Sequence, residues 1–429
     1  MVSRERPLRI GYVNQDFPPE VGAGPARILE MALHWKRAGA EVTVVTGIPH
    51  RRLPNMADGA VHPGYRGRMF MAEEWQGLRV LRSWLYVSPK RGFVRTVANN
   101  ASFMASSTLH ALARAEKFDV VIASTPPFLA QLTGDAIRRA RGIPMVVEIR
   151  DLWPDYLVDL GMVRSARAQR MIFGLERYLL RRAAHVVVVT ESFRRRVVQK
   201  GVPAERVDVI PNGAELGRYY RADEEPPLPA LRRAAGEFVV GYLGNFGAGQ
   251  ELRTVVRAAA RLQDRAPGVR FVLAGDGKEK AAVEACAAEL GVRNLQLCPP
   301  IDKEQTRAFY NACDLCLVPL APVPIFSETV PSKLFEIMAC ERPVLASVAG
   351  EAAEVVARSG GGRVSPPGDD EALAAAVLEF RGMDPQLRQA MGARGREYVR
   401  GHYDREALAA RYLEILHEVA ARRPSALTP

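Results

Sequence analysis

The chain has 429 residues, more than one hydrophobic core usually holds, so its length predicts two domains. Hydrophobic residues make up 48% and charged residues 25%, a balance that excludes a largely disordered chain. No run of 18 apolar residues occurs, which argues against a membrane-spanning helix, and no signal peptide pattern precedes the first strand-like run. We therefore expect a cytoplasmic protein.

The positive charge lies in the first half of the sequence. Residues 1–220 hold 33 Lys and Arg against 20 Asp and Glu, an excess of 13, whereas residues 221–429 hold 26 against 28. Residues 51–100 carry nine basic and three acidic groups, interleaved with aromatic side chains. Such a stretch suits an anionic membrane surface, an acidic substrate or ordinary solvation. We expect no nucleic acid partner, because no nucleic-acid-binding motif accompanies the charge.

Apolar strand-like runs alternate with helical patterns along the chain, which predicts βαβ units and parallel sheets. The predicted fold class is α/β, with two facing, doubly wound, Rossmann-like domains and a ligand cleft between them. The first domain spans residues 1–222, a Pro-rich linker 223–232 and the second domain 233–400. An amphipathic helix at 405–421 would return to the first domain. The predicted strands are 10–13, 42–46, 80–84, 120–124, 145–149, 185–190, 238–243, 271–274, 295–297, 315–319, 344–347 and 362–365.

Three glycine-containing loops follow predicted strands and precede predicted helices. Glycine lets a backbone approach a ligand closely, and the start of a helix favours an anion. We expect a phosphate-bearing cleft rather than three unrelated tight turns. The first loop is not a dinucleotide-binding fingerprint, because Arg27 stands where the third glycine would fall. The loops contribute Gly22 and Gly24, Gly244 and Asn245, and Gly275 and Lys278.

Charged residues close the predicted strand at 145–149. Arg150 and Asp151 follow it directly, at the position where side chains of a parallel sheet reach a ligand. A structural Arg/Asp pair in a turn is the alternative to a functional role. The five cysteines all lie in the second half, with no disulfide-framework spacing, which suits a reducing compartment. We interpret Cys313 and Cys316 as buried thiols rather than as a zinc or redox pair.

Two glutamates, Glu328 and Glu336, are separated by seven residues that contain a predicted helix start at Pro331. One carboxylate would lie in a loop and the other two helical turns further on. The unbonded N–H groups between them would suit a phosphate. Two carboxylates so placed have separate roles rather than a shared acid/base role.

These motifs together resemble the retaining glycosyltransferases of family 4, which have the GT-B fold. The likeness covers nearly the whole chain and rests on Glu328-x7-Glu336, Gly22-Ala-Gly24, the segment 210–213, the turn at 273–277 and the helix at 331–340. The segments 18–27, 150–155 and 332–336 look most like the bacterial subgroup that builds O-antigen, capsule and exopolysaccharide. Members of that subgroup often transfer acetamido-deoxyhexoses such as fucosamine.

The resemblance implies roles for individual residues. Glu336 would accept hydrogen bonds from both ribose hydroxyls of a nucleotide, and Glu328 would orient the donor sugar. The amides of Ser332, Lys333 and Leu334, with the loop of Gly22 and Gly24, would hold the diphosphate. Arg150 or Asp151 would touch donor sugar and acceptor. The base would rest near Pro300 and Ile301.

The chain departs from the family pattern at two positions. Asn245 and Gln250 stand in the loop where many members carry an Arg and a Lys that neutralise the diphosphate, which leaves Lys333, Lys278 or Arg253 for that task. Arg150 and Asp151 stand where many members carry a histidine. No Asp-x-Asp triplet occurs, so we expect no metal cofactor.

The predicted function is retaining transfer of a hexose or acetamido-hexose, with a nucleotide sugar, most simply a UDP-sugar, as donor. The acceptor would be lipid-linked or a saccharide, and residues 51–100 would contact the anionic inner face of the membrane. Two alternatives are a nucleotide-sugar epimerase of the GT-B fold and a non-catalytic, nucleotide-sugar-binding partner of another transferase.

Overall fold

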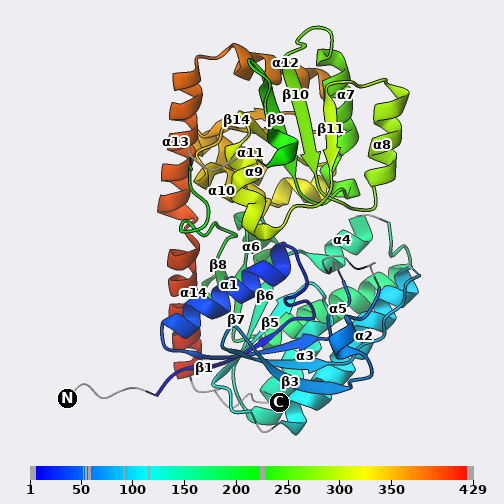
Figure 1. The fold of residues 1–429 in the computed structure, drawn as a ribbon. Helices are drawn as coiled ribbons and strands as arrows, with labels where there is room; N and C mark the ends of the chain where they lie inside the picture. The colour runs from blue at the N-terminus through cyan, green and yellow to red at the C-terminus, as the bar shows by residue number, and fades with distance from the viewer. Residues whose placement is uncertain are drawn as a thin grey trace, which may run out of the picture. The chain divides into compact units, whose positions relative to one another are not determined.

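The computed structural model describes residues 6–51, 53, 56, 59–90, 92–114, 116–159, 161–222 and 228–422. The chain divides into two compact units, residues 1–211 with 406–429 and residues 212–405. Each unit is a layered α/β structure around its own sheet (Figure 1). None of the described helices is both long and apolar enough to cross a bilayer.

The first unit is built on an eight-stranded sheet in the order β3-β4-β2-β1-β5-β6-β7-β8, parallel except for the β3–β4 pair. Its strands are β1 (Arg9–Val13), β2 (Glu41–Gly47), β3 (Phe70–Trp75), β4 (Leu78–Ser83), β5 (Val120–Thr125), β6 (Met145–Ile149), β7 (His185–Val188) and β8 (Val207–Val209). Its α-helices are α1 (Ala23–Arg37), α2 (Phe93–Ala113), α3 (Ala130–Arg141), α4 (Trp153–Asp159), α5 (Ala166–Arg182), α6 (Glu191–Gln199) and the C-terminal α14 (Arg405–Ala421).

Alternating apolar residues give this sheet two buried faces. Val121 and Ala123 of β5 pack with α2, α3, α5 and α6, whereas Val120 and Ile122 of the same strand pack with α1 and α14. Parallel strands covered on both faces need such continuous apolar runs. The C-terminal helix therefore completes one face of the first unit, and Trp35 of α1 donates a hydrogen bond to the carbonyl of Ala409 at 2.9 Å.

A buried ion pair joins α1 to the centre of this sheet. Arg27 and Glu148 are 1% and 0% exposed at the side chain, and Nε of Arg27 lies 3.1 Å from Oε1 of Glu148. Tyr12 and Ser124 donate hydrogen bonds to the other carboxylate oxygen at 2.8 and 2.6 Å. Burial alone would raise the pKa of Glu148, but Arg27, Arg150 and the two hydroxyl donors outweigh burial and lower it.

The remaining donors of Arg27 fix the end of the first unit. Its two terminal nitrogens donate to the carbonyls of Pro211 and Ile210 at 2.8 and 2.9 Å. Arg27 stands where a dinucleotide fingerprint would have its third glycine. Its hydrogen bonds connect α1 to β6 and to the last residues of the unit before the second unit begins.

The second unit has a six-stranded, fully parallel sheet in the order β11-β10-β9-β12-β13-β14. Its strands are β9 (Phe238–Leu243), β10 (Val269–Ala274), β11 (Leu295–Cys298), β12 (Leu315–Pro319), β13 (Val344–Ser347) and β14 (Gly362–Ser365). Its α-helices are α7 (Leu252–Leu262), α8 (Lys280–Glu289), α9 (Thr306–Asn311), α10 (Ser332–Ala339), α11 (Glu351–Ser359), α12 (Asp370–Gly382) and α13 (Pro385–His402). One face packs on α9, α10, α11 and α13, the other on α7, α8 and α12.

The α/β class and the two Rossmann-like sheets are confirmed, and every predicted strand is present within a few residues of its expected bounds. The edge strands β3 and β8 were not predicted, because β3 carries charged residues and β8 has only three residues. Of the predicted linker, residues 223–227 lie outside the described residues. Cys313 and Cys316 are buried free thiols, as expected.

The Arg27–Glu148 pair should dominate the stability of the first unit. Changing Glu148 to Gln leaves a buried guanidinium without its counter-charge, which should cost about 3–5 kcal/mol of unfolding free energy. All four tryptophans belong to the first unit, so urea denaturation followed by tryptophan fluorescence reports on it. Glu284→Gln, on the exposed face of α8, is the control and should leave the fluorescence transition unchanged. Equal midpoints for both variants would contradict a structural role for the pair.

Candidate functional site

The carboxyl edge of the sheet in the second unit gathers most of the predicted donor-binding residues. The strand order reverses between β9 and β12, and ligands of open α/β sheets bind at such a switch point. The loop after β9 begins at Gly244, and the segment after β12 leads through the 3₁₀ helix Pro324–Glu328 to α10. The carbonyl of Gly249 accepts a hydrogen bond from the Ala321 amide at 2.9 Å, so the two loops flanking the switch point are tied together.

The loops after β9 and β10 pack backbone on backbone. Gly275 has φ +149°, and a Cβ there would lie 1.8 Å from the carbonyl oxygen of Gly244. At Gly277, with φ +159°, a Cβ would lie 2.3 Å from the carbonyl oxygen of Phe246. The Phe246 amide in turn donates to the Asp276 carbonyl at 2.8 Å. The glycines we interpreted as phosphate-contacting are thus required first by loop-to-loop packing.

Lys333 lies in the first turn of α10, against the start of the β9 loop. Its Nζ is 4.0 Å from the centre of the Tyr242 ring, and a Cβ on Gly244 would come within 2.5 Å of that nitrogen. Desolvation lowers the pKa of Lys333 to about 7, while the nearby Glu336 carboxylate opposes the shift. The residue as a whole is partly exposed, whereas its ammonium group is crowded by protein atoms. A cation in this state gains more than a solvated one from an anionic ligand.

The two glutamates take different positions, as their spacing predicted. Glu328 ends the 3₁₀ helix before α10, and Glu336 lies in the second turn of α10. Tyr310 of α9 donates a hydrogen bond to Oε2 of Glu336 at 3.4 Å. Both glutamates are partly exposed, so their carboxylates are not sealed in the core.

The helix start differs in detail from its prediction. Pro331 is the N-cap of α10 with extended backbone, and Ser332 is the first helical residue. The Leu334 amide donates to the Pro331 carbonyl at 3.0 Å, whereas the amides of Ser332 and Lys333 precede any helical i→i−4 bond. A ligand at this end would therefore meet the amides of Ser332 and Lys333 more readily than that of Leu334.

Four further predicted residues lie at the same edge of the sheet. Asn245 is exposed and its amide approaches Oε1 of Gln250 at 3.5 Å. Lys278 is exposed in the turn after β10. Pro300 is exposed after β11, and Ile301 is half-buried against the core beneath α10.

The other predicted residues belong to the first unit, again at the carboxyl edge of its sheet. Gly22 is the N-cap of α1, and Gly24 lies in its first turn, not in a free loop. A Cβ on Gly24 would lie 2.6 Å from a terminal nitrogen of Arg150, so this glycine makes room for the guanidinium. Arg150 donates from Nε to the Thr125 carbonyl at 3.1 Å and from a terminal nitrogen to that of Pro126 at 3.3 Å.

Asp151 follows Arg150 before α4. Desolvation raises the pKa of Asp151 to about 6, and Arg150 opposes the shift. The residue is nevertheless exposed, so the carboxylate is crowded by neighbouring atoms without being sealed from solvent. A carboxyl group with a pKa of about 6 is half-protonated near pH 6 and mostly ionised at pH 7, where it accepts hydrogen bonds.

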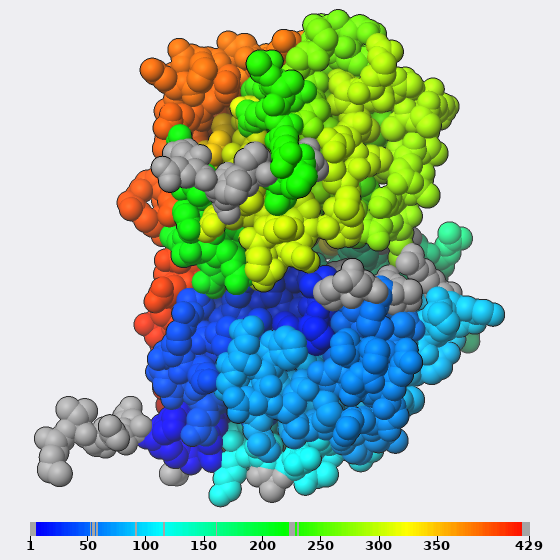
Figure 2. Space-filling model, in the orientation of Figure 1, coloured from blue at the N-terminus to red at the C-terminus, as the bar shows by residue number. Residues whose placement is uncertain are grey.

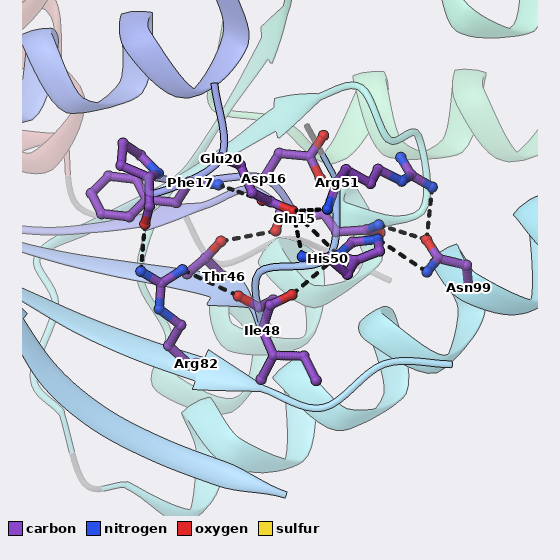
Figure 3. Close-up of polar contacts among 12 residues, drawn as sticks. Gln15, Asp16, Phe17, Glu20, Thr46, Ile48, His50, Arg51, Arg82 and Asn99 are labelled. Atoms are coloured by element: carbon purple, nitrogen blue, oxygen red, sulfur yellow. Dashed lines mark hydrogen bonds and ion pairs between the residues drawn. The ribbon is translucent and has the colours of Figure 1, made fainter. Parts of the chain in front are cut away.

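A cluster of polar side chains at the ends of β1 and β2 was not predicted from the sequence. We call Gln15, Glu20, His50, Arg51 and Asn99 the β1–β2 loop cluster (Figure 3). The members come from three separate segments, so no sequence motif joins them. Tyr242 and Tyr310, which support Lys333 and Glu336, also lack a motif.

Within the described part of the chain, no group of three or more His, Cys, Asp or Glu residues is arranged to hold a metal ion.

Two family models match this sequence. Residues 22–213 match the glycosyl transferase 4-like domain, and residues 237–381 match glycosyl transferases group 1. Among curated proteins, WcaI of Escherichia coli, named for colanic acid biosynthesis as a glycosyl transferase, is 26% identical over 77% of this chain and 81% of its own. WbjE of Pseudomonas aeruginosa, named as a glycosyltransferase, is 26% identical over 63% of this chain and 68% of its own.

Solved structures share the fold. Sucrose-phosphate synthase from Thermosynechococcus elongatus superposes with a TM-score of 0.72 at 21% identity, covering 96% of this chain and 99% of its own. Anabaena HepE, crystallised with UDP and glucose, superposes with a TM-score of 0.69 at 20% identity, covering 96% of this chain and 99% of its own.

The lowered pKa of Lys333 can be measured directly. In the chain labelled at lysine side chains, an NMR titration should show one lysine with a midpoint near 7, identified by its absence in Lys333→Met. Glu336→Gln should lower this midpoint further, because the Glu336 carboxylate raises the pKa of Lys333. A midpoint near the ordinary lysine value of about 10.4, or one that Glu336→Gln leaves in place, would contradict the desolvated position described above.

Proposed function

Because the chain belongs to the group 1 glycosyltransferases, with the GT-B fold, we propose that it is a retaining enzyme that transfers a hexose or acetamido-hexose from a UDP-sugar. The acceptor is a lipid-linked or free saccharide in the biosynthesis of a cell-surface polysaccharide. The names of WcaI and WbjE support a glycosyltransferase, and that of WcaI supports the polysaccharide context. The HepE complexes with UDP and with UDP-glucose support the choice of UDP.

The observation that carries the proposal is the arrangement at the start of α10. A desolvated lysine, the amides of Ser332 and Lys333 that precede the helical hydrogen bonds of α10, and a partly exposed glutamate one turn later lie at the switch point of a parallel sheet. A nucleoside diphosphate offers the complementary groups, namely phosphate oxygens for the lysine and amides and vicinal hydroxyls for the carboxylate.

In this proposal Lys333 supplies the charge that the loop residues Asn245 and Gln250 do not. The diphosphate favours the ammonium form, so its binding raises the pKa of Lys333. Above about pH 7 the binding step then takes up a proton, and affinity falls as the pH rises. Charge that develops on the leaving diphosphate is stabilised by the same ammonium group and by the helix amides.

Glu328, at the end of the 3₁₀ helix, orients the donor sugar and stabilises positive charge near its anomeric carbon. The leaving phosphate takes the proton of the acceptor hydroxyl on the same face of the sugar, so configuration is retained without a protein nucleophile. Arg150 and Asp151 contact the acceptor from the first unit. The proposal includes no metal cofactor, because the sequence lacks an Asp-x-Asp triplet.

The proposal places the enzyme at an anionic membrane through residues 51–100. Exposed apolar side chains accompany the basic residues there, with Met69 58%, Phe93 42% and Val94 78% exposed. This stretch, in the lighter blues, covers much of the visible face of the first unit in Figure 2. Apolar and cationic side chains on one surface suit the interface of an acidic bilayer.

The division of roles between the two glutamates can be tested with UDP and 2′-deoxy-UDP. The wild-type chain should bind UDP about tenfold or more tightly than 2′-deoxy-UDP. Glu336→Gln should lower the affinity for UDP and abolish the preference for UDP over the deoxy form. Glu328→Gln should leave UDP binding within about twofold while lowering sugar transfer by about a hundredfold. Glu284→Gln, exposed on α8, is the control for both measurements. Undiminished ribose preference in Glu336→Gln would refute its assigned role.

Membrane contact can be tested by cosedimentation with vesicles. The chain should bind vesicles that contain phosphatidylglycerol at low salt, bind neutral vesicles poorly, and dissociate as salt is added. Val94→Ser should weaken binding, whereas Leu387→Ser, also well exposed (61% against 78% for Val94) but on α13 of the second unit, should not. Failure to bind acidic vesicles would remove the membrane part of the proposal and leave the transfer reaction untouched.

A further inference from the structure

The β1–β2 loop cluster is a second group of polar side chains, and none of its members belongs to the proposed donor site. It lies at the carboxyl edge of the sheet of the first unit, in the loops that follow β1 and β2 (Figure 3). Gln15, Glu20 and His50 are almost fully buried, and Asn99 of α2 is 6% exposed. Hydrogen bonds among buried polar side chains fix the geometry of the cluster, in which Oε1 of Gln15 is buried without a hydrogen-bond partner among the described residues.

Asn99 is the centre of the cluster, and its orientation is determined. Its Oδ1 accepts hydrogen bonds from Gln15 at 2.7 Å and from a terminal nitrogen of Arg51 at 2.9 Å. Its Nδ2 donates to the Tyr86 carbonyl at 2.7 Å and approaches Nε2 of His50 at 3.3 Å. If the Asn99 amide were flipped, its nitrogen would face the donor groups of Gln15 and Arg51. Only the observed orientation therefore allows these hydrogen bonds.

Glu20 holds the backbone that carries Arg51. Its Oε1 accepts hydrogen bonds from the amides of His50 and Arg51, both at 2.9 Å. Since Asn99 donates to Nε2 of His50, the ring proton sits on Nδ1, which faces the Ile48 carbonyl at 3.1 Å. The loop after β2 is thereby clamped to the loop after β1.

Arg51 is partly exposed, whereas the other ionisable members of the cluster, Glu20 and His50, are buried. Among the described residues its guanidinium has one hydrogen-bond partner, Asn99, so most of its donors remain available. Arg82 nearby shows what a structural arginine of this unit looks like. It is fully buried, is paired with Glu73 at 2.6 Å, and lies over the rings of Phe17, Tyr65 and Trp75.

Asp16 lies beside this network. Arg51 has unused hydrogen-bond donors, whereas Asp16 has an unused hydrogen-bond acceptor. Its amide donates to Oδ1 of Asn14 at 2.9 Å, and Asn14 donates to the carbonyls of Ser124 and Pro126, so Asp16 is fixed between β1 and β5. Its own Oδ1 is buried without a hydrogen-bond partner among the described residues. In Figure 3 Asp16 and Arg51 both lie above Gln15 and His50. A buried acceptor without a partner is costly unless a ligand supplies a donor.

We propose that Arg51 and Asp16 form the acceptor subsite and that the acceptor is a saccharide carrying a phosphate, with the phosphate on Arg51 and a hydroxyl on Asp16. Gln15, Glu20, His50 and Asn99 act as positioning residues for Arg51. The inference rests on the proposed transferase function and adds the chemical class of its acceptor. A planar guanidinium with free donors can form two parallel, charge-assisted hydrogen bonds to one phosphate. A neutral sugar offers no charged group for such a pair.

The test uses the full-length protein with UDP present to fill the donor site. The probes are glucose 1-phosphate and N-acetylglucosamine 1-phosphate, each compared with its free sugar by calorimetry. The phosphorylated sugars should bind about tenfold or more tightly than the free sugars. Arg51→Met should abolish this preference. Arg51→Lys should retain part of it, because lysine keeps the positive charge but cannot form the paired hydrogen bonds of a guanidinium. Asp16→Asn should weaken the phosphorylated and free forms alike.

Two controls separate this inference from other outcomes. Arg37→Met, exposed in the last turn of α1 at the opposite edge of the sheet, removes one charge and should change nothing. Asn99→Ala should lower the phosphate preference less than Arg51→Met, with the tryptophan fluorescence transition confirming that the first unit is folded. UDP affinity should be the same in wild type and Arg51→Met. A matching loss of UDP affinity would assign Arg51 to the donor and overturn the inference.

A third comparison identifies where the phosphate comes from. Farnesyl diphosphate in detergent micelles presents a lipid-linked diphosphate, whereas the sugar 1-phosphates are free. Binding of the first alone, sensitive to Arg51→Met, indicates a lipid carrier, and binding of the second alone indicates a soluble sugar phosphate. If no probe distinguishes wild type from Arg51→Met while UDP still binds, the inference fails and the proposed transferase function stands. If UDP itself does not bind, the proposed function fails.

Discussion

The first unit depends on one constraint, that the carboxylate of Glu148 is buried at the end of β6 and has to be paired. Arg27 pairs with it, and the hydroxyls of Tyr12 and Ser124 complete its coordination. Three strands and α1 are thereby joined at one point. Since α1 is held at its second turn, its start is held too, and that start contains Gly22 and Gly24 beside Arg150. A structural ion pair thus fixes the start of α1 beside Arg150.

The two units prepare their ligand-facing edges by different means. In the second unit the loops after β9 and β10 pack closely through their backbones, and the predicted donor-binding side chains stand on α10 and the 3₁₀ helix before it. In the first unit side chains hold the loops, through the β1–β2 loop cluster and through Arg150, which donates to the Thr125 carbonyl at the end of β5. A backbone contact suits an invariant group such as a diphosphate, whereas side-chain networks suit a partner that differs between enzymes.

Much of this architecture could be predicted from the sequence, because parallel strands buried on both faces leave continuous apolar runs. The separate positions of Glu328 and Glu336 followed from seven intervening residues and one proline. What could not be predicted depends on contacts between distant segments. Arg27 looked like a missing glycine, since nothing near it in sequence reveals a carboxylate 121 residues away. The free capacity of Arg51 depends on Gln15, Glu20 and Asn99, which share no spacing. Gly24 was expected to make room for phosphate, and the structure shows it making room for Arg150.

The contact between Gly244, Gly275 and Phe246 also limits how this enzyme can change. Any side chain at Gly275 or Gly277 would collide with backbone atoms, which cannot move aside as a flexible side chain can. Substitution at these two glycines is therefore not tolerated at this edge of the sheet. In the proposed donor site, a shift in nucleotide preference would come from exposed side chains near these loops, such as Asn245, Lys278 and Pro300. Libraries that vary these three positions and keep the glycines could be screened for new donors. They would contain few variants in which a side chain at Gly275 or Gly277 disrupts the loops.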